Sequence, residues 1–246
     1  MGDNIHKDTE RTGSQGPHLT CIKYPAIFTS PIVDNPIQPL PSMTDLTATN
    51  RQHFNAVAST HHTDFGLFIE TIMEEITNRR SWISSRVASE QITKSESESE
   101  SESESESIRL LDYACGAGTA TKALLPFITQ AIGLDLSENM VKEYNAWATA
   151  HGYPAEKMRA YCLDLLADSP SEGEIQLELE LSGFDVVVVC MALHHVADAQ
   201  RLLARLAGCL KPGGVCVVID GVPTQTPPAT GQGLDTDTAA GGAGDD

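Results

Sequence analysis

Positive charge is scarce in this chain. Its 246 residues include 16 lysines and arginines against 34 aspartates and glutamates, which gives a formal net charge of −18 at pH 7. Binding to nucleic acid requires a stripe of basic side chains that neutralises phosphates, and no such stripe occurs in the sequence. We therefore expect no nucleic-acid partner.

Long apolar runs and paired cysteine motifs are also lacking. The longest apolar stretch, 184–193, is much shorter than the roughly 20 residues of a membrane-spanning helix, and no signal-peptide pattern opens the chain. The six cysteines form no C-x-x-C motif and no Cys/His spacing typical of zinc. We interpret the cysteines as reduced, buried thiols and expect a cytoplasmic protein with no membrane span and no metal.

Both ends of the chain are poor in apolar patterning. Residues 1–43 contain closely spaced prolines, and residues 221–246 consist mainly of Gly, Pro, Thr, Ala and Asp. Prolines favour extended conformations without a packed face, so we predict a disordered arm and a disordered tail.

Residues 94–107 are a Ser-Glu repeat without one apolar side chain, which predicts a disordered low-complexity loop. Its serines, most of them followed three residues later by glutamate, resemble acidophilic kinase sites; a neutral repeat expansion is the alternative. Before it, apolar residues recur at three- and four-residue intervals over 45–60 and 64–88. This spacing predicts two amphipathic helices, which we assign to an N-terminal helical cap, residues 44–93.

The remaining segment, 108–220, alternates between two kinds of pattern. Near-continuous apolar runs predict strands at 108–113, 131–135, 158–163, 184–190 and 214–220. Helical patterns at 119–128, 137–151 and 196–210 separate most of them, while the structure of an insertion at 169–183 is left open. Buried strands alternating with helices predict an α/β fold, a doubly wound and mostly parallel sheet covered on both faces.

The run IRLLDYACGAG, residues 108–118, ends a strand-like segment in a glycine-rich turn. Glycine lets backbone N–H groups approach a ligand closely, so Gly116 and Gly118 predict a nucleotide-type cofactor site. Asp135 follows Gly118 by seventeen residues, at the end of the second strand of the unit. A carboxylate there is placed to accept hydrogen bonds from ribose hydroxyls.

Acidic residues end several of the expected strands. Asp112, Asp135, Asp164 and Asp220 would meet at the carboxyl edge of the sheet, where such folds bind ligands. No lysine or arginine lies near the glycine turn. This edge suits a nucleotide cofactor that has a positive centre and no pyrophosphate.

The segments LLDYACGAGTAT, GLDLSENM, YCLDLL, FDVVVVCMALHHV and LARLAGCLKPGG resemble, in order and spacing, the class I S-adenosylmethionine-dependent methyltransferases. Within that family they are similar to the small-molecule branch that includes ubiquinone-biosynthesis-type enzymes. The resemblance covers about 45–220 and implies a Rossmann-like core, S-adenosyl-L-methionine as cofactor and a small-molecule methyl acceptor.

The resemblance also implies roles for individual positions. Those that match the family's cofactor-binding positions are Asp112, Ala114, Gly116, Gly118, Asp135, Leu136, Met140, Asp164, Leu165 and Cys190. The residues from Asp112 to Gly118 would hold the methionine end of the cofactor. Asp135 would bind the ribose, and Leu136 and Met140 would flank the nucleoside. Asp164 and Leu165 would contact adenine, and Cys190 would lie near the reactive methyl. Ala114 replaces a residue that is more often glycine, a small change expected to affect affinity slightly.

Other interpretations of these residues remain open. Asp112 and Asp164 could cap helices or face solvent, and Met140 could belong to the core. His194 and His195 are candidate catalytic bases, because a neutral imidazole can accept a hydroxyl proton near pH 7. A carbon or amine acceptor needs no such base, and the two histidines would then only shape the pocket.

Two other functions compete with methyl transfer. An NAD(P)-dependent oxidoreductase is disfavoured because GAGTAT lacks the third glycine of G-x-G-x-x-G and no Tyr-x-x-x-Lys follows. A non-catalytic binding or interaction protein of the same fold is the second alternative.

The sequence after Asp220 departs from the family, because it cannot supply the strands that normally complete the sheet. We therefore expect the strand at 214–220 to be an exposed edge. Stability and turnover would then be low unless a partner chain covers that edge.

Overall fold

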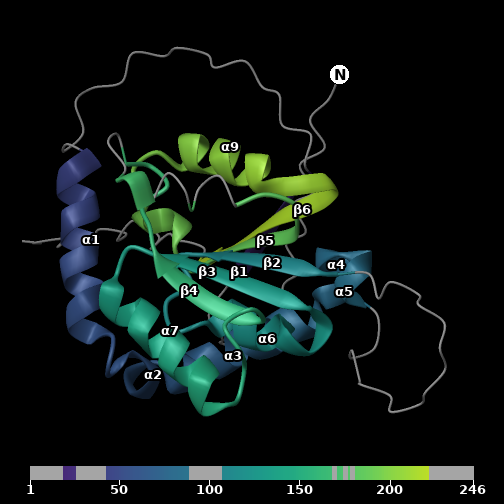
Figure 1. Ribbon diagram of the computed structural model, residues 1–246, viewed down its shortest axis with the longest axis horizontal. Helices are drawn as coiled ribbons and strands as arrows, with labels where there is room; N and C mark the ends of the chain where they lie inside the picture. The colour runs from purple at the N-terminus through teal and green to yellow at the C-terminus, as the bar shows by residue number, and fades with distance from the viewer. Residues whose placement is uncertain are drawn as a thin grey trace, which may run out of the picture.

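The computed structural model describes residues 19–25, 43–88, 107–167, 171–173, 177 and 181–221. Five strands of a six-stranded sheet are parallel: β2 (Arg109–Tyr113), β3 (Gln130–Asp135), β4 (Met158–Cys162), β5 (Phe184–Cys190) and β6 (Leu210–Gly221). They lie in the order β6-β5-β2-β3-β4, with β2 at the centre (Figure 1). The predicted parallel strands are confirmed, with ends that differ by a few residues.

Helices cover both faces of this sheet. In Figure 1, α9 (Ala199–Cys209) lies on one side of the strands, and α3 (Gly66–Asn78), α6 (Thr119–Leu124) and α7 (Glu138–Ala150) lie on the other. Side chains of β5 alternate between the two cores: Val186 and Val188 pack toward α3 and α6, and Val187 packs toward α9. The expectation of a doubly wound α/β sheet is therefore confirmed.

The edge beyond β6 differs from the expectation. Residues Leu19–Pro25 form strand β1, which pairs antiparallel with β6 from Leu19↔Gly221 to Pro25↔Val215. This part of the arm is therefore not disordered, and β6 is not the exposed edge that seemed to need a partner chain. The physical reason is that β6 offers a row of unpaired backbone groups, and a segment free of internal proline completes it.

The cap contains more breaks than predicted. Helix α1 (Met43–Val57) is followed by α2 (His61–Asp64), α3, α4 (Arg80–Ile83) and α5 (Ser85–Ala88), so a single helix over 64–88 is wrong. Ser84 is extended (φ −159°, ψ 139°), and its hydroxyl accepts a hydrogen bond from the Arg86 N–H at 3.3 Å. The break lets Ile83 and Val87 both enter the core.

A buried carboxylate joins the cap to the amino ends of the strands. Asp185, 1 % exposed, forms ion pairs with Arg86 of α5 and Lys211 of β6. Its Oδ2 also accepts a hydrogen bond from the Arg109 N–H at 2.9 Å, and Arg86 donates to the Ser107 carbonyl at 3.2 Å. These contacts fix the end of the sheet opposite the candidate site.

Several expectations concern residues outside the described ranges. They are the rest of the arm, the Ser-Glu repeat up to residue 106, most of the insertion at 169–183 and the tail from 222. Within the described ranges, none of the helices has the length and apolar character needed to cross a bilayer.

Deleting residues 1–25 should expose the backbone of β6, lower the melting temperature and cause concentration-dependent association, because an unpaired strand edge recruits other strands. Light scattering coupled to gel filtration, together with thermal melting, measures both effects. Deleting residues 1–18 retains β1 and is the matched control. Equal behaviour of the two truncated chains would show that β1 does not protect the edge.

Candidate functional site

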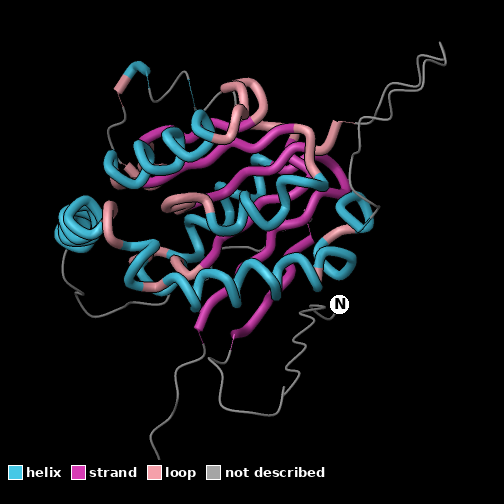
Figure 2. The backbone as a smooth tube through the Cα atoms, turned by 90° about the horizontal axis from the view of Figure 1, so that it is seen from below, coloured by secondary structure: helices cyan, strands magenta, loops and turns pink. Residues whose placement is uncertain are grey.

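A cavity of about 520 Å³ opens at the carboxyl ends of the parallel strands. The loops after β2, β3 and β5 line one side of it, and α1, α2 and α3 line the other. In Figure 2, α1 is seen nearly end-on beside these loops, which places the cap across the strand ends. The strand order reverses between β2 and β5, which is the usual ligand site of doubly wound folds.

The turn after β2 has left-handed backbone at alternate positions. Ala114 (φ 54°), Gly116 (φ 50°) and Gly118 (φ 94°) all have positive φ. A Cβ on Gly116 would meet no atom within 4 Å, so this face of the turn is open to the cavity, whereas a Cβ on Gly118 would lie 2.9 Å from a ring carbon of Tyr144. Gly118 therefore allows the close packing of Tyr144. Ala114 has a strained left-handed backbone, whereas the sequence analysis had considered only the small size of its methyl group.

Asp135 holds the glycine turn in place. Its Oδ2 accepts a hydrogen bond from the Gly116 N–H and its Oδ1 accepts one from the Ser137 N–H, each at 2.8 Å. The side chain is 9 % exposed, and burial raises the pKa of its carboxyl. Ser137 in turn caps α7 by accepting the Met140 N–H at 3.1 Å.

Asp112 both caps a helix and lines the cavity. Its Oδ2 accepts hydrogen bonds from the N–H of Thr121 (3.0 Å) and from its hydroxyl (2.7 Å), at the start of α6. Burial raises the pKa of Asp112 to about 7, although the two bonds from Thr121 act in the opposite direction. A buried carboxyl with this pKa changes its charge readily when a cation binds beside it.

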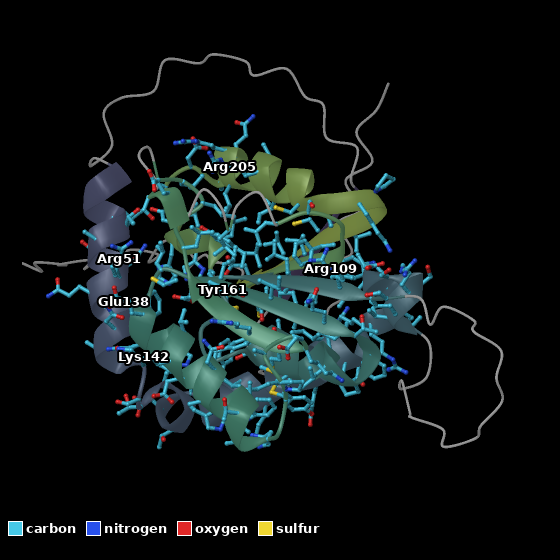
Figure 3. All side chains as sticks on the ribbon, in the orientation of Figure 1. Arg51, Arg109, Glu138, Lys142, Tyr161 and Arg205 are labelled. Carbon is cyan, nitrogen blue, oxygen red and sulfur yellow. The ribbon has the colours of Figure 1, made fainter. Side chains whose placement is uncertain are left out.

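The cap is hydrogen-bonded to the core by two asparagines that the sequence analysis did not single out. The Oδ1 atom of Asn55 accepts from the Ser137 hydroxyl (2.7 Å) and from the Asn139 N–H (3.1 Å). Asn50 donates to the carbonyl of His195 at 2.9 Å. Figure 3, which labels Arg51 on α1 and Glu138 on α7, shows these two helices side by side. The only sequence signal was a pair of amides on an otherwise amphipathic helix.

The two histidines after β5 lie in different surroundings. His194 Nδ1 is 2.7 Å from Asp220 Oδ1, and the other oxygen of Asp220 accepts the His194 N–H at 3.1 Å. The ring of His195 meets Phe54 of α1 edge-on, with centroids 5.3 Å apart. Burial lowers the pKa of His195, which favours a neutral ring.

Most of the predicted site residues meet at the cavity. Those that line it are Asp112, Ala114, Gly116, Asp135, Leu136, Met140, Cys190, His194 and His195. Gly118, Asp164 and Leu165 do not line it. The carboxylate of Asp164 accepts the Leu166 N–H at 2.8 Å, and Leu165 is buried in the core at 3 % exposure.

Sequence reasoning missed the cavity-lining rings of the cap. Phe54, Phe65 and Phe68 line the cavity, and their helical spacing had indicated only an amphipathic face. Cys162 is exposed, which corrects the expectation that the cysteines are all buried. The described ranges contain no cluster of three or more side chains suited to a metal ion.

The fold and the cavity define a Rossmann-like cofactor-binding domain. Residues 111–216 match the family described as methyltransferase domain. An uncharacterised methyltransferase of Schizosaccharomyces pombe is 38% identical over 111 residues, which are 45% of this chain and 38% of that protein. A ubiquinone biosynthesis O-methyltransferase of Rhodopseudomonas palustris is 32% identical over 111 residues, 45% of this chain and 39% of its own length.

One solved structure, the DhpI–SAM–HEP complex, superimposes with a TM-score of 0.50 at 17% identity and covers 76% of this chain and 70% of that one. It supports the fold alone. Residues 111–216 of this chain are therefore similar to methyltransferase domains. The chain spans about two fifths of the length of the curated relatives that it matches.

Replacing Ala114 with glycine should raise the free energy of unfolding by about 1 kcal/mol, because an L-residue in the left-handed region costs about 1–2 kcal/mol and glycine costs little there. Ala117→Gly, in the same turn and without a positive φ, should instead lower it by about 0.5–1 kcal/mol. Urea denaturation compares the two. A destabilising Ala114→Gly would mean that the turn bears no strain.

Proposed function

We propose that this chain binds S-adenosyl-L-methionine in the cavity and transfers its methyl group to a small-molecule acceptor. The observation that supports this best is the acid-lined glycine turn at the carboxyl edge of the sheet. Gly116 leaves open space there, Asp112 and Asp135 supply buried carboxyls, and the described residues that line the cavity include no lysine or arginine. This arrangement fits a positively charged nucleoside without phosphates.

Different lining residues contact different parts of the cofactor in this proposal. In our proposal Asp112 and the open face of Gly116 receive the methionine end, and Asp135 accepts hydrogen bonds from the ribose hydroxyls with the lone pairs left by its two backbone contacts. Leu136 and Met140 flank the nucleoside, and Cys190 lies toward the acceptor. When bound, the cofactor supplies a methyl group on a positively charged sulfur. For the adenine end, Leu163 lines the cavity, in place of the predicted Asp164 and Leu165.

His194 is the stronger candidate for the base. The Asp220 carboxylate accepts the proton of Nδ1, so Nε2 of the neutral ring carries the lone pair. An acceptor hydroxyl can then give its proton to Nε2 while its oxygen bonds to the methyl carbon and the carbon–sulfur bond breaks. The ring later releases this proton to solvent. His195, held against Phe54 and Asn50, shapes the acceptor side of the cavity.

The two alternatives differ from this proposal in what they would bind. An NAD(P)-dependent oxidoreductase must place a pyrophosphate against the glycine turn, where the carboxyl of Asp112, when ionised, would repel it. A non-catalytic protein of the same fold would bind the cofactor without turning it over.

S-adenosylhomocysteine should bind the full chain and stabilise it by about 2.7 kcal/mol at a hundredfold its dissociation constant, whereas NAD should not. Asp135→Ala should weaken this binding by roughly 1.5–3 kcal/mol, because the ribose loses a charged acceptor. Asp164→Ala, outside the cavity lining, is the control and should bind nearly as the unaltered chain does. Calorimetry showing no binding, or a shift with NAD alone, would overturn the proposal.

Affinity for S-adenosylhomocysteine should fall up to about tenfold per pH unit below pH 7 and level off above it. The pKa of Asp112 is about 7 in the free protein, and the ligand's ammonium favours the ionised carboxylate, so binding at lower pH must displace a proton. The Asp112→Asn variant should bind S-adenosylhomocysteine more weakly at pH 8, and its affinity should no longer fall below pH 7. Calorimetry across pH 5.5–8.5 measures it; an unchanged pH profile in the variant would exclude Asp112 as the titrating group.

A further inference from the structure

The cap contributes several aromatic rings to the lining of the cavity. Phe54 lies edge-on to His195 at 5.3 Å and to His53 at 5.1 Å, and Phe65 lies 5.1 Å from His61. Phe68, Ile69 and Ile72 of α3 continue this wall. Such a surface offers apolar contact and few hydrogen bonds to an acceptor.

The charges that line the cavity have a single sign. The acidic residues are Asp64 at its exposed mouth and Asp112 and Asp135 in its depth, and no lysine or arginine occurs among its described lining residues. Arg51 on α1 and Lys142 on α7, both labelled in Figure 3, are exposed and lie outside this lining. Lys142 is bonded instead to the Asn139 side chain at 3.1 Å.

Three of the four histidines that line the cavity, His61, His194 and His195, supply no free positive charge in place of lysine or arginine. Burial lowers the pKa of both His61 and His195, which favours their neutral forms. His194 faces the Asp220 carboxylate at 2.7 Å, so a positive charge on its ring is already balanced within the protein.

We infer that the acceptor side of this cavity takes uncharged, largely apolar molecules and rejects acceptors that carry a carboxylate or phosphate. An anion entering it would lose hydration, find no lysine or arginine among the described lining residues in exchange, and meet the field of Asp64. An uncharged acceptor loses little hydration and gains contact with the phenylalanine wall. This inference rests on the proposed function, because it concerns the second ligand of the same site.

The test compares 4-hydroxyacetophenone with 4-hydroxybenzoate, which have nearly the same shape and differ by a methyl group in place of a charged oxygen. Calorimetry or ligand-observed NMR on the full chain saturated with S-adenosylhomocysteine gives both affinities. We expect the ketone to bind at least about tenfold more tightly than the carboxylate.

Reversing the charge of Asp64 at the mouth of the cavity tests whether the charge of the lining causes the preference for the ketone over the carboxylate. Asp64→Lys should narrow the ratio of the two affinities at least about threefold, and Asp64→Asn should narrow it less. Glu70→Lys makes the same change of charge on an exposed part of α3 outside the lining and should leave the ratio unchanged.

Equal binding of the two probes, failure of the ketone to bind at millimolar concentration, or equal effects of Asp64→Lys and Glu70→Lys would each overturn the inference. Failure of S-adenosylhomocysteine to bind the unaltered chain would instead overturn the proposed function. The two failures are therefore distinguishable, because the first set of results is obtained only on chain that has bound S-adenosylhomocysteine.

Discussion

The carboxylate of Asp135 is the contact on which the site depends. One oxygen holds the glycine turn that follows β2, and the other holds the start of α7 after β3. A single buried charge thus fixes two loops that come from neighbouring strands, and both loops line the cavity. The energetic cost of burying it is offset by backbone N–H groups that would otherwise lack partners at a turn and a helix end.

The cap is connected to this same point. Asn55 of α1 bonds to Ser137, the residue whose N–H Asp135 accepts, while Asn50 bonds to the loop after β5. Helix α1 therefore contacts the loops of both halves of the sheet, on either side of the point between β2 and β5 where the strand order reverses. Four hydrogen bonds at Asn50 and Asn55 hold this helix, and with it part of the apolar wall, against the polar loops: Asn50 donates one, the side chain of Asn55 accepts two, and the backbone carbonyl of Asn55 accepts one from Asn139.

What could be predicted from the sequence was whatever depends on local pattern. Continuous apolar runs predicted β2 through β6, and the acids at the ends of these strands followed from their positions in the sequence. Strand β1 could not be predicted, because its partner β6 lies almost 200 residues away and pairing at that separation has no local signal. The roles of Gly118 and Ala114 were also hidden, since one depends on the ring of Tyr144 and the other on a backbone angle.

The contacts of Arg86 allow the length of the Ser-Glu repeat to vary. Arg86, near the end of α5, bonds to Asp185 and to the carbonyl of Ser107, just before β2. The end of the cap at α5 and the start of β2 are thus held together by contacts that do not depend on the number of residues between them. Lengthening or shortening the Ser-Glu repeat by whole dipeptides would leave both of these contacts in place, so the length of the repeat can vary without a change in the folded segments on either side of it.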